Sequence, residues 1–395
     1  MIRGGGPGAV LLVGPAGVGK TTLAVDLAAG LLCTHQDPAA RPCGACRSCR
    51  LVAHGAHPDL HVLGPEGAGR QVVIGGPGSK ARGVRDLIGE LALLPVEGGA
   101  RVAIIESAHR MNEDAQAALL KTLEEPPAGA TIVLCADAEE PLLPTIRSRS
   151  ARLRLGPVGV RDIEAILADA GAADPPVAAR AARIASGRPG VALAWVVRRE
   201  ALRERDAIGR TLLDLIAARP ADRLEGVRKL AIAASTIAGI GDGTALELGT
   251  DDAEQEVGRS AAKGKRVPGK GPTRQTTEVA AGPGEDLASD SEGGGPARAP
   301  AAERRRAAEA LIALWTDIAR DVALCQRGLD ASVRDLGLLD EVRGVGVDVD
   351  PDALHAFIDR LGQAAVLVAG NASPELVLDD LALAWPRARS GSRAA

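Results

Sequence analysis

The stretch AVLLVGPAGVGKTTLAVDLAAGLL, residues 9–32, decides the fold of the N-terminal part of the chain. An apolar run typical of a buried strand leads into the pattern G-x-x-x-x-G-K-[ST] at residues 14–21, and an amphipathic helical pattern follows at Lys20–Leu32. In such a loop, glycines allow backbone N–H groups to turn around phosphate groups, and the helix N-terminus adds a partial positive charge. The stretch therefore predicts a phosphate-binding loop between a strand and a helix.

ATP is the ligand that this loop predicts, because a lysine and a hydroxyl follow its last glycine. Lys20 can reach the β- and γ-phosphates, and the hydroxyl of Thr21 can hold Mg²⁺. The alternative is a glycine-rich turn that Lys and Thr follow by chance, and the strand and the helix on either side disfavour it. The residues expected to bind the nucleotide are Gly14, Gly17, Gly19, Lys20, Thr21 and Thr22.

Short apolar runs and helical patterns alternate through residues 1–156, the first expected domain. Alternation of this kind predicts an α/β domain, in which flanking helices cover a parallel sheet. The expected strands are Ala9–Val13, Asp59–Leu63, Arg101–Glu106, Thr131–Ala136 and Ala151–Leu155, and the main expected helices are Lys20–Leu32, Arg82–Leu94 and Asn112–Glu125.

The rest of the chain is expected to be helical apart from one long linker. Residues 157–240 are rich in Ala, Leu and Arg and predict a small helical domain. Residues 241–302 combine mixed charge with many Gly and Pro and few large apolar residues, so we expect a disordered linker. Helical periodicity returns at residues 303–387, which predicts an all-α domain, and residues 388–395 are expected to form a tail.

The composition excludes several classes of protein. Among 395 residues there are 3 Trp, 1 Phe and 0 Tyr, too few for a surface that stacks on single-stranded bases. The net charge of -4 argues against DNA binding by overall charge. No apolar run reaches the ~18–20 residues of a membrane span, and the first residues show no secretory signal. We therefore expect a cytoplasmic protein without a membrane segment.

Four of the six cysteines follow the spacing C-x9-C-x2-C-x2-C. Four thiolates at this spacing can close a tetrahedron around Zn²⁺ and leave no open position for a reactive water, so a structural zinc site is expected. His35 is an outside candidate to replace the first cysteine as a ligand, and free thiols are the alternative to a metal site. The expected zinc ligands are Cys33, Cys43, Cys46 and Cys49.

A second strand in proteins with this loop normally ends in the acidic residues that support hydrolysis. Here the apolar run 102–105 is followed by Glu106, which can complete the Mg²⁺ site with Thr21, and then by Ser107. A serine hydroxyl is a poor general base in the position where a glutamate would polarise the attacking water. The sequence therefore predicts ATP binding with weak or absent hydrolysis by this chain.

Several motifs together resemble the AAA+ subunits of the bacterial DNA polymerase III clamp loader. They are the loop GPAGVGKT (14–21), the four-cysteine insertion, HPD (57–59), NEDAQAALLKTLEEPP (112–127), TIRSRSARLR (145–154) and NASPELVL (371–378). Within that family, the pair Glu106-Ser107 favours the delta-prime type over the gamma/tau motor type. Two further departures agree, because Ala136-Asp137 and Gly190 stand where motor subunits carry a Ser/Thr pair and a phosphate-contacting arginine.

The resemblance implies a fold and a role. An AAA+ domain with a zinc knuckle at 33–49 would be followed by a helical lid and an all-α collar for oligomerisation. The chain would join gamma/tau and delta subunits in a hetero-pentamer that loads the sliding clamp on primer-template DNA during replication. Arg149 of the Ser-Arg-Ser stretch would act as an arginine finger in a neighbouring ATP site, with Arg147 as the fallback.

Two other functions remain open at this point. One is the ATP-hydrolysing gamma/tau-type motor subunit, which would need a substitute for the missing base at Ser107. The other is a P-loop kinase for a small molecule, which ranks far lower because it has no use for the TIRSR stretch or the C-terminal helices.

Overall fold

The computed structural model describes residues 8–65, 71–79, 81–97, 99–172, 174–240 and 300–388. The linker expected at 241–302 lies outside these residues up to 299, and the expected tail lies outside them beyond residue 388. In the described part, no helix combines the length and the apolar character needed to cross a membrane.

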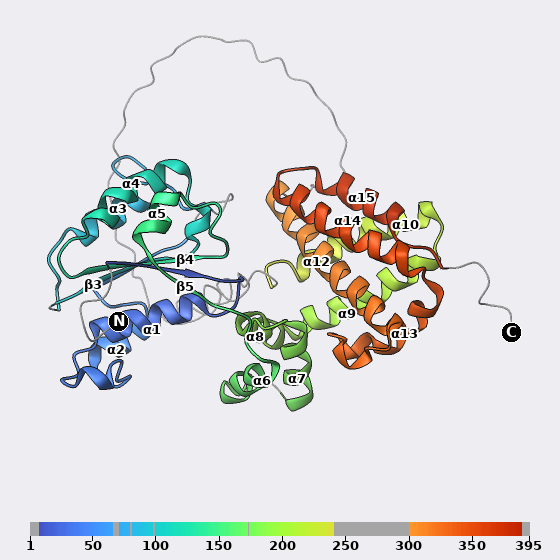
Figure 1. Ribbon diagram of the computed structural model, residues 1–395, viewed down its shortest axis with the longest axis horizontal. Coiled ribbons are helices and arrows are strands. Elements are labelled where there is room, and N and C mark those ends of the chain that lie inside the picture. Colours follow the sequence, from blue (N-terminus) through green and yellow to red (C-terminus); the bar gives the residue numbers. More distant parts are fainter. Residues whose placement is uncertain are drawn as a thin grey trace, which may run out of the picture.

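A five-stranded parallel sheet forms the core of the N-terminal domain (Figure 1). Its strands follow the order β2-β3-β4-β1-β5. All residues of β1 and β3 are buried, which explains why β1 and residues 102–105 of β3 are uninterrupted apolar runs. The strands are β1 (Ala9–Val13), β2 (Leu60–Leu63), β3 (Arg101–Ile105), β4 (Ala130–Ala136) and β5 (Ala151–Arg154). The α/β architecture expected from the sequence is confirmed.

Helices cover both faces of this sheet (Figure 1). Alternate residues of β1 serve the two faces, because Leu11 packs in one apolar cluster with α3, α4 and α5, whereas Val10 and Leu12 pack in another with α1 and α2. The helices are α1 (Lys20–Leu32), α2 (Arg47–Ala53), α3 (Val84–Leu91), α4 (Glu113–Glu124) and α5 (Pro144–Arg149). Short 3-10 turns η1 (Pro38–Ala40) and η2 (Ala108–Arg110) lie between them.

The described remainder of the chain is helical. Three short helices follow the sheet: α6 (Val160–Asp169), α7 (Pro175–Ile184) and α8 (Pro189–Val197). The larger group comprises α9 (Arg199–Asp214), α10 (Pro220–Ala233), α12 (Ala301–Gln326), α13 (Leu339–Asp348), α14 (Pro351–Ala369) and α15 (Pro374–Ala384). The connecting 3-10 turns are η3 (Leu215–Ala217), η4 (Ala234–Thr236), η5 (Asp330–Ser332) and η6 (Leu336–Leu338).

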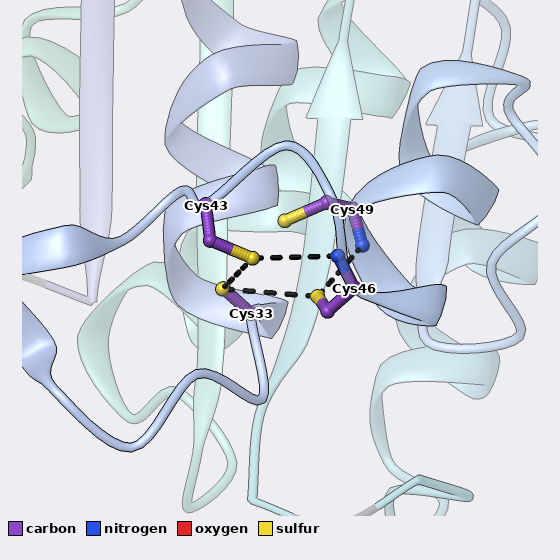
Figure 2. Close-up of side chains that lie close together, drawn as sticks. All are labelled: Cys33, Cys43, Cys46 and Cys49. Carbon is purple, nitrogen blue, oxygen red and sulfur yellow. Dashed lines mark hydrogen bonds between the residues drawn. The ribbon is translucent and has the colours of Figure 1, made fainter.

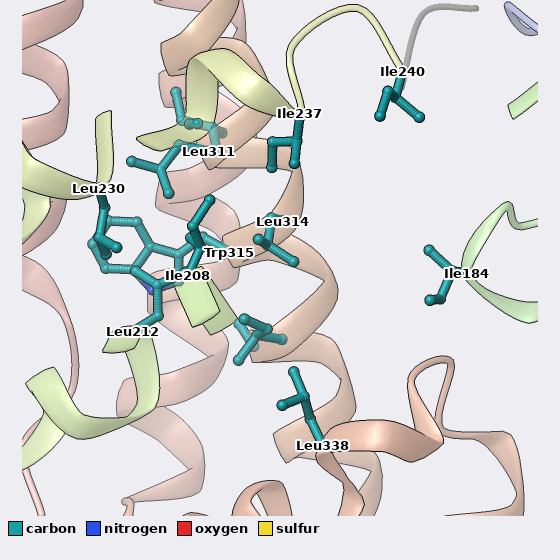
Figure 3. Packing of buried hydrophobic residues seen from close by; sticks show 14 of the residues in the cluster. Ile184, Ile208, Leu212, Leu230, Ile237, Ile240, Leu311, Leu314, Trp315 and Leu338 are labelled. Atoms are coloured by element: carbon teal, nitrogen blue, oxygen red, sulfur yellow. The ribbon is translucent and has the colours of Figure 1, made fainter. Parts of the chain in front are cut away.

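Helices α9 and α10 pack against the C-terminal helices, although they precede the linker in sequence. Figure 3 shows Ile208 and Leu212 of α9 and Leu230 of α10 beside Trp315 of α12 in one apolar cluster. We therefore propose that residues 199–240 belong to the C-terminal helical domain and that α6, α7 and α8 alone form the lid. The sequence shows only that the helices exist, because periodicity does not reveal which helix an apolar stripe meets.

Three of the four aromatic side chains of the chain meet in this helical core. Trp315, Phe357 and Trp385 form a triangle with ring centroids 5.4, 5.5 and 4.6 Å apart. The indole Nε1–H of Trp385 donates to the carbonyl of Leu212, 2.9 Å away, and so links α9 to the chain after α15. These three aromatic side chains therefore serve packing.

A buried ion cluster around Asp335 joins the lid to the C-terminal helices. Asp335 lies just before η6, is 3% exposed and pairs with Arg205 of α9, which is 2% exposed. Arg180 of α7 donates to Asp335 over 3.0 Å and also pairs with Asp206 of α9. Burial alone would raise the pKa of Asp335, but the two guanidinium groups outweigh it and lower the pKa.

Removing one partner of this cluster is expected to be costly. Asp335→Ala leaves the buried guanidinium group of Arg205 and the partly buried one of Arg180 without their shared carboxylate, so we expect a loss of about 3–5 kcal/mol in the free energy of unfolding. Urea unfolding followed by circular dichroism measures it. Asp340→Ala, at a carboxylate whose side chain is 96% exposed, serves as the control and should change stability by less than about 0.5 kcal/mol. Equal stability of both variants would contradict the structural role of the cluster.

Candidate functional site

The phosphate loop follows β1, at the sheet edge where the carboxyl ends of the parallel strands meet. Gly17 and Gly19 adopt the left-handed conformation, with φ of 77° and 103°, so both positions require glycine. Gly19 is also the N-cap of α1, whose first residues are Lys20, Thr21 and Thr22. The N-terminus of α1 and the conformations of the two glycines together fit a chain of phosphate groups, as the sequence predicts.

Lys20 already has three partners within the protein. Its ammonium group donates to the carbonyl oxygens of Gly14 and Pro15, at 2.8 and 2.9 Å, and to Oδ1 of Asp137 at 2.7 Å. The residue is 8% exposed. Because an ammonium group has three N–H donors, all of them are occupied. The backbone of the loop therefore fits a phosphate chain, whereas its lysine is engaged elsewhere.

Asp137 belongs to the candidate site through contacts that the sequence did not predict. It follows β4, the neighbour of β1, and its own N–H donates to Nδ1 of His109 over 3.1 Å. Its second carboxylate oxygen lies 3.5 Å from Nε2 of the same ring. A charged residue directly after a largely apolar strand, at the edge that carries the loop, is the signal that could have found it.

The residues expected to support hydrolysis lie at the same edge, one strand further on. Glu106 follows β3 directly, is half-buried, and its backbone N–H donates to the carbonyl of Leu63 over 3.0 Å. Ser107 is the N-cap of η2 and makes no side-chain capping hydrogen bond. Glu106 and Thr21 thus both belong to the edge where Mg²⁺ would bind, but the strand supplies no second carboxylate to act as a base.

The lid rests directly on the phosphate loop. The backbone N–H of Gly190, in the first turn of α8, donates to the carbonyl of Gly17 over 2.9 Å. A Cβ atom at Gly17 would come within 2.8 Å of the Val191 side chain, so this close approach also requires glycine. The first turn of α8 therefore covers the middle of the loop.

The four cysteines predicted to bind zinc come together (Figure 2). Their sulfur atoms all lie within 4.8 Å of one another, and Cys33 Sγ lies 3.6 Å from Cys43 Sγ and 3.8 Å from Cys46 Sγ. A tetrahedral site with Zn–S bonds of about 2.3 Å places its sulfur atoms about 3.8 Å apart. The donor set therefore fits a Zn²⁺ ion, which would cross-link the end of α1 to the start of α2.

Backbone hydrogen bonds prepare two of these sulfur atoms for metal binding. The N–H of Cys46 donates to Cys43 Sγ, and the N–H of Cys49 donates to Cys46 Sγ, both at 3.4 Å. The second bond lowers the pKa of Cys46 to about 5, whereas burial raises the pKa of Cys49 to about 12. His35 does not join the cluster through its ring, which bonds within its own loop to Asp37.

Arg149, the expected arginine finger, ends α5 on the surface of the domain. Its guanidinium lies 2.6 Å from Glu124 Oε1, and the two side chains are 36% and 49% exposed. An exposed pair of this kind contributes about 0–1 kcal/mol, so it does not prevent Arg149 from reaching another partner. Arg147, the fallback, is less exposed, and its Nε is buried without a partner.

These features define a P-loop α/β domain with a helical lid. A family model described as DNA polymerase III, delta subunit, matches residues 4–159. The chain is 44% identical over 141 residues to the delta-prime subunit of DNA polymerase III from Pseudomonas aeruginosa, which is 36% of this chain and 40% of that protein. It is 36% identical over 155 residues to the tau subunit from Salmonella typhimurium, which is 39% of this chain and 22% of that protein.

The family model matches the N-terminal part of the chain, and the chain spans only 40% of the length of the Pseudomonas relative. A solved gamma subunit-related protein from Thermotoga maritima covers 93% of this chain and 97% of its own, with 15% identity and a TM-score of 0.32, too low to support an argument. The sequence matches confirm the resemblance that the motifs indicate. The N-terminal part of the chain is therefore similar to subunits of DNA polymerase III, with delta-prime and tau subunits among its relatives.

Zinc removal provides a test of the cysteine cluster. We expect about one zinc ion per chain in the purified protein and its loss in Cys43→Ser, because three thiolates no longer close the tetrahedron. The thermal midpoint should fall by several degrees, and a chelator should lower that of the parent protein in the same way. Cys325→Ser, at a cysteine outside the cluster, should retain the metal. Zinc-supplemented parent protein that contains no bound zinc contradicts the site.

The environment of His109 predicts a pH dependence of stability. Burial lowers the pKa of His109, and the nearby Asp137 opposes this shift only in part. The unfolded chain therefore binds more protons than the folded one, and stability should fall as the pH drops below about 6.5. Part of the loss between about pH 7 and 5.5 should disappear in His109→Gln but persist in His355→Gln, which changes an exposed residue of α14. Identical pH profiles for both variants would count against this assignment.

Proposed function

We propose that the chain is a delta-prime-like subunit of the DNA polymerase III clamp loader. It would act as a stator in a hetero-pentamer with gamma/tau and delta subunits. In that assembly it would offer Arg149 to the ATP site of a neighbour and help to load the sliding clamp on primer-template DNA. The family of its N-terminal domain supports the class of protein, and the placement of Arg149 carries the specific role.

The position of Arg149 suits a finger that acts outside its own chain. It ends a short helix that starts at Pro144 and is followed directly by β5, so the backbone on both sides is fixed. The side chain is exposed, and its pair with Glu124 is weak enough to exchange for a phosphate. A guanidinium group that reaches a γ-phosphate stabilises the charge of the transition state.

The chain's own nucleotide site supports a stator rather than a motor. The P-loop backbone, Thr21 and Glu106 would hold ATP and Mg²⁺, and the metal would neutralise phosphate charge when bound. Ser107 provides no base for the attacking water, and Lys20 is held by Asp137. Zinc bound by the four cysteines would fix the segment between α1 and α2, without a part in the chemistry.

The second candidate is the ATP-hydrolysing gamma/tau-type motor subunit. The complete G-x-x-x-x-G-K-[ST] pattern with its two left-handed glycines favours it. It predicts steady ATP turnover by the purified chain that Lys20→Ala abolishes. A stator predicts no turnover above that of Lys20→Ala, so a phosphate-release assay on the isolated chain separates the two.

Loss of the guanidinium is expected to impair the whole loader. In a loader reconstituted with clamp and primed DNA, Arg149→Ala should lower stimulated ATP turnover by the share of the site that Arg149 completes, because a finger in trans contributes on the order of 10³–10⁵ in rate at one site. Arg149→Lys should restore little, since an ammonium group lacks the planar fork.

Arg210→Ala is the matched control, because Arg210 also lies in an exposed ion pair, with Glu341. It should leave turnover within about twofold of the parent loader, in keeping with a weak surface contact. Gel filtration must show equal assembly for all variants. Unchanged turnover of the Arg149→Ala loader at equal assembly excludes the finger.

A further inference from the structure

The contact between Lys20 and Asp137 joins two parts of the chain that are 117 residues apart. Sheet register brings them together, because Val13 of β1 lies beside Ala136 of β4 and the N–H of Gly14 donates to the carbonyl of Ala136 over 3.2 Å. The side chain of Lys20 is 9% exposed and that of Asp137 is 36% exposed. The carboxylate therefore reaches the lysine from the same edge that would receive the phosphates.

His109 holds Asp137 in this place. The backbone N–H of Asp137 donates to Nδ1 of His109 at 3.1 Å, and Nε2 of the ring lies 3.5 Å from Oδ2. The backbone at the end of β4 and the imidazole ring of His109 both hold the carboxylate of Asp137 in position. An approaching ligand therefore does not displace it freely. The carboxylate of Asp137 faces the ammonium group of Lys20, whose three N–H donors are all occupied.

The lid occupies the other side of the same loop. The carbonyl of Gly17 accepts from the N–H of Gly190, and Val191 packs on Gly17. This contact holds the loop against the lid, whereas the competition with phosphate arises at the charge of Lys20.

We propose that Asp137 takes the place of a nucleotide phosphate at Lys20 and thereby makes this P-loop a weak site for nucleoside triphosphates. A phosphate that approaches Lys20 must break a charge-assisted hydrogen bond and then lie near a carboxylate of the same sign. The repulsion grows with the charge of the phosphate chain, so ATP loses more affinity than ADP does. This inference deepens the proposed function, since it explains how a complete P-loop serves a subunit that does not turn over ATP.

Nucleotide binding by the full, isolated chain tests the proposal without any partner. Isothermal titration with ATP and with ADP, each with Mg²⁺, is carried out on the parent protein, Asp137→Asn and Asp137→Ser. We expect ATP to bind at least about tenfold more tightly to both variants, a change of about 1.4 kcal/mol, and ADP to gain less. Asp26→Asn removes a carboxylate from the exposed face of α1 and should stay within about twofold of the parent.

Two results overturn the proposal. Equal ATP affinity of the parent and both variants shows that the carboxylate does not compete with phosphate. Weaker binding of the Mg²⁺ complex by the variants, with no change when Mg²⁺ is omitted, shows that Asp137 binds the metal instead. Circular dichroism confirms that each variant is folded, and the use of two replacements guards against a local defect in one. The outcome is independent of Arg149, so failure here and failure of the proposed function are distinguishable.

Discussion

The parallel pairing of β1 with β4 is the constraint on which the rest of the structure depends. It buries two apolar strands in the middle of the sheet and places their carboxyl ends side by side. The phosphate loop follows the end of β1, and Asp137 follows the end of β4. A shift of one residue in the pairing would turn the apolar side chains of β1 to the opposite face and separate the two groups. Packing of the core and the electrostatics of the site are therefore set by the same register.

Much of the N-terminal fold could be predicted because its signals are local. The apolar runs identify all five strands to within one residue at every end, and the loop pattern locates the start of α1 at Lys20. Helices α2 and α5 could not be predicted from periodicity, since they have 7 and 6 residues and show less than two turns of any pattern. The cysteine spacing predicts a cluster, but only the fold shows sulfur separations that suit zinc.

Contacts between distant segments explain what the sequence could not show. The sequence marks Ala136-Asp137 as unusual for a motor subunit, but the carboxylate meets Lys20 only through the pairing of two strands. In the same way, α9 and α10 look like a continuation of the lid, whereas their apolar faces meet helices that follow the linker. Tertiary packing determines which helices meet. The apolar periodicity of a helix is the same whichever neighbour it packs against, so the sequence does not identify that neighbour.

A complete phosphate loop and an incomplete hydrolysis site conflict only if the loop must turn over ATP. In this chain the loop has a second use, because its lysine joins β1 to β4 and its central carbonyl binds the first turn of α8. The glycines are then required by backbone conformation and by close contact with the lid, whether or not a phosphate is present. These contacts link the sheet to the lid at the phosphate loop, and the proposed stator role would require such a link to be rigid. Retention of the motif is therefore compatible with loss of the chemistry.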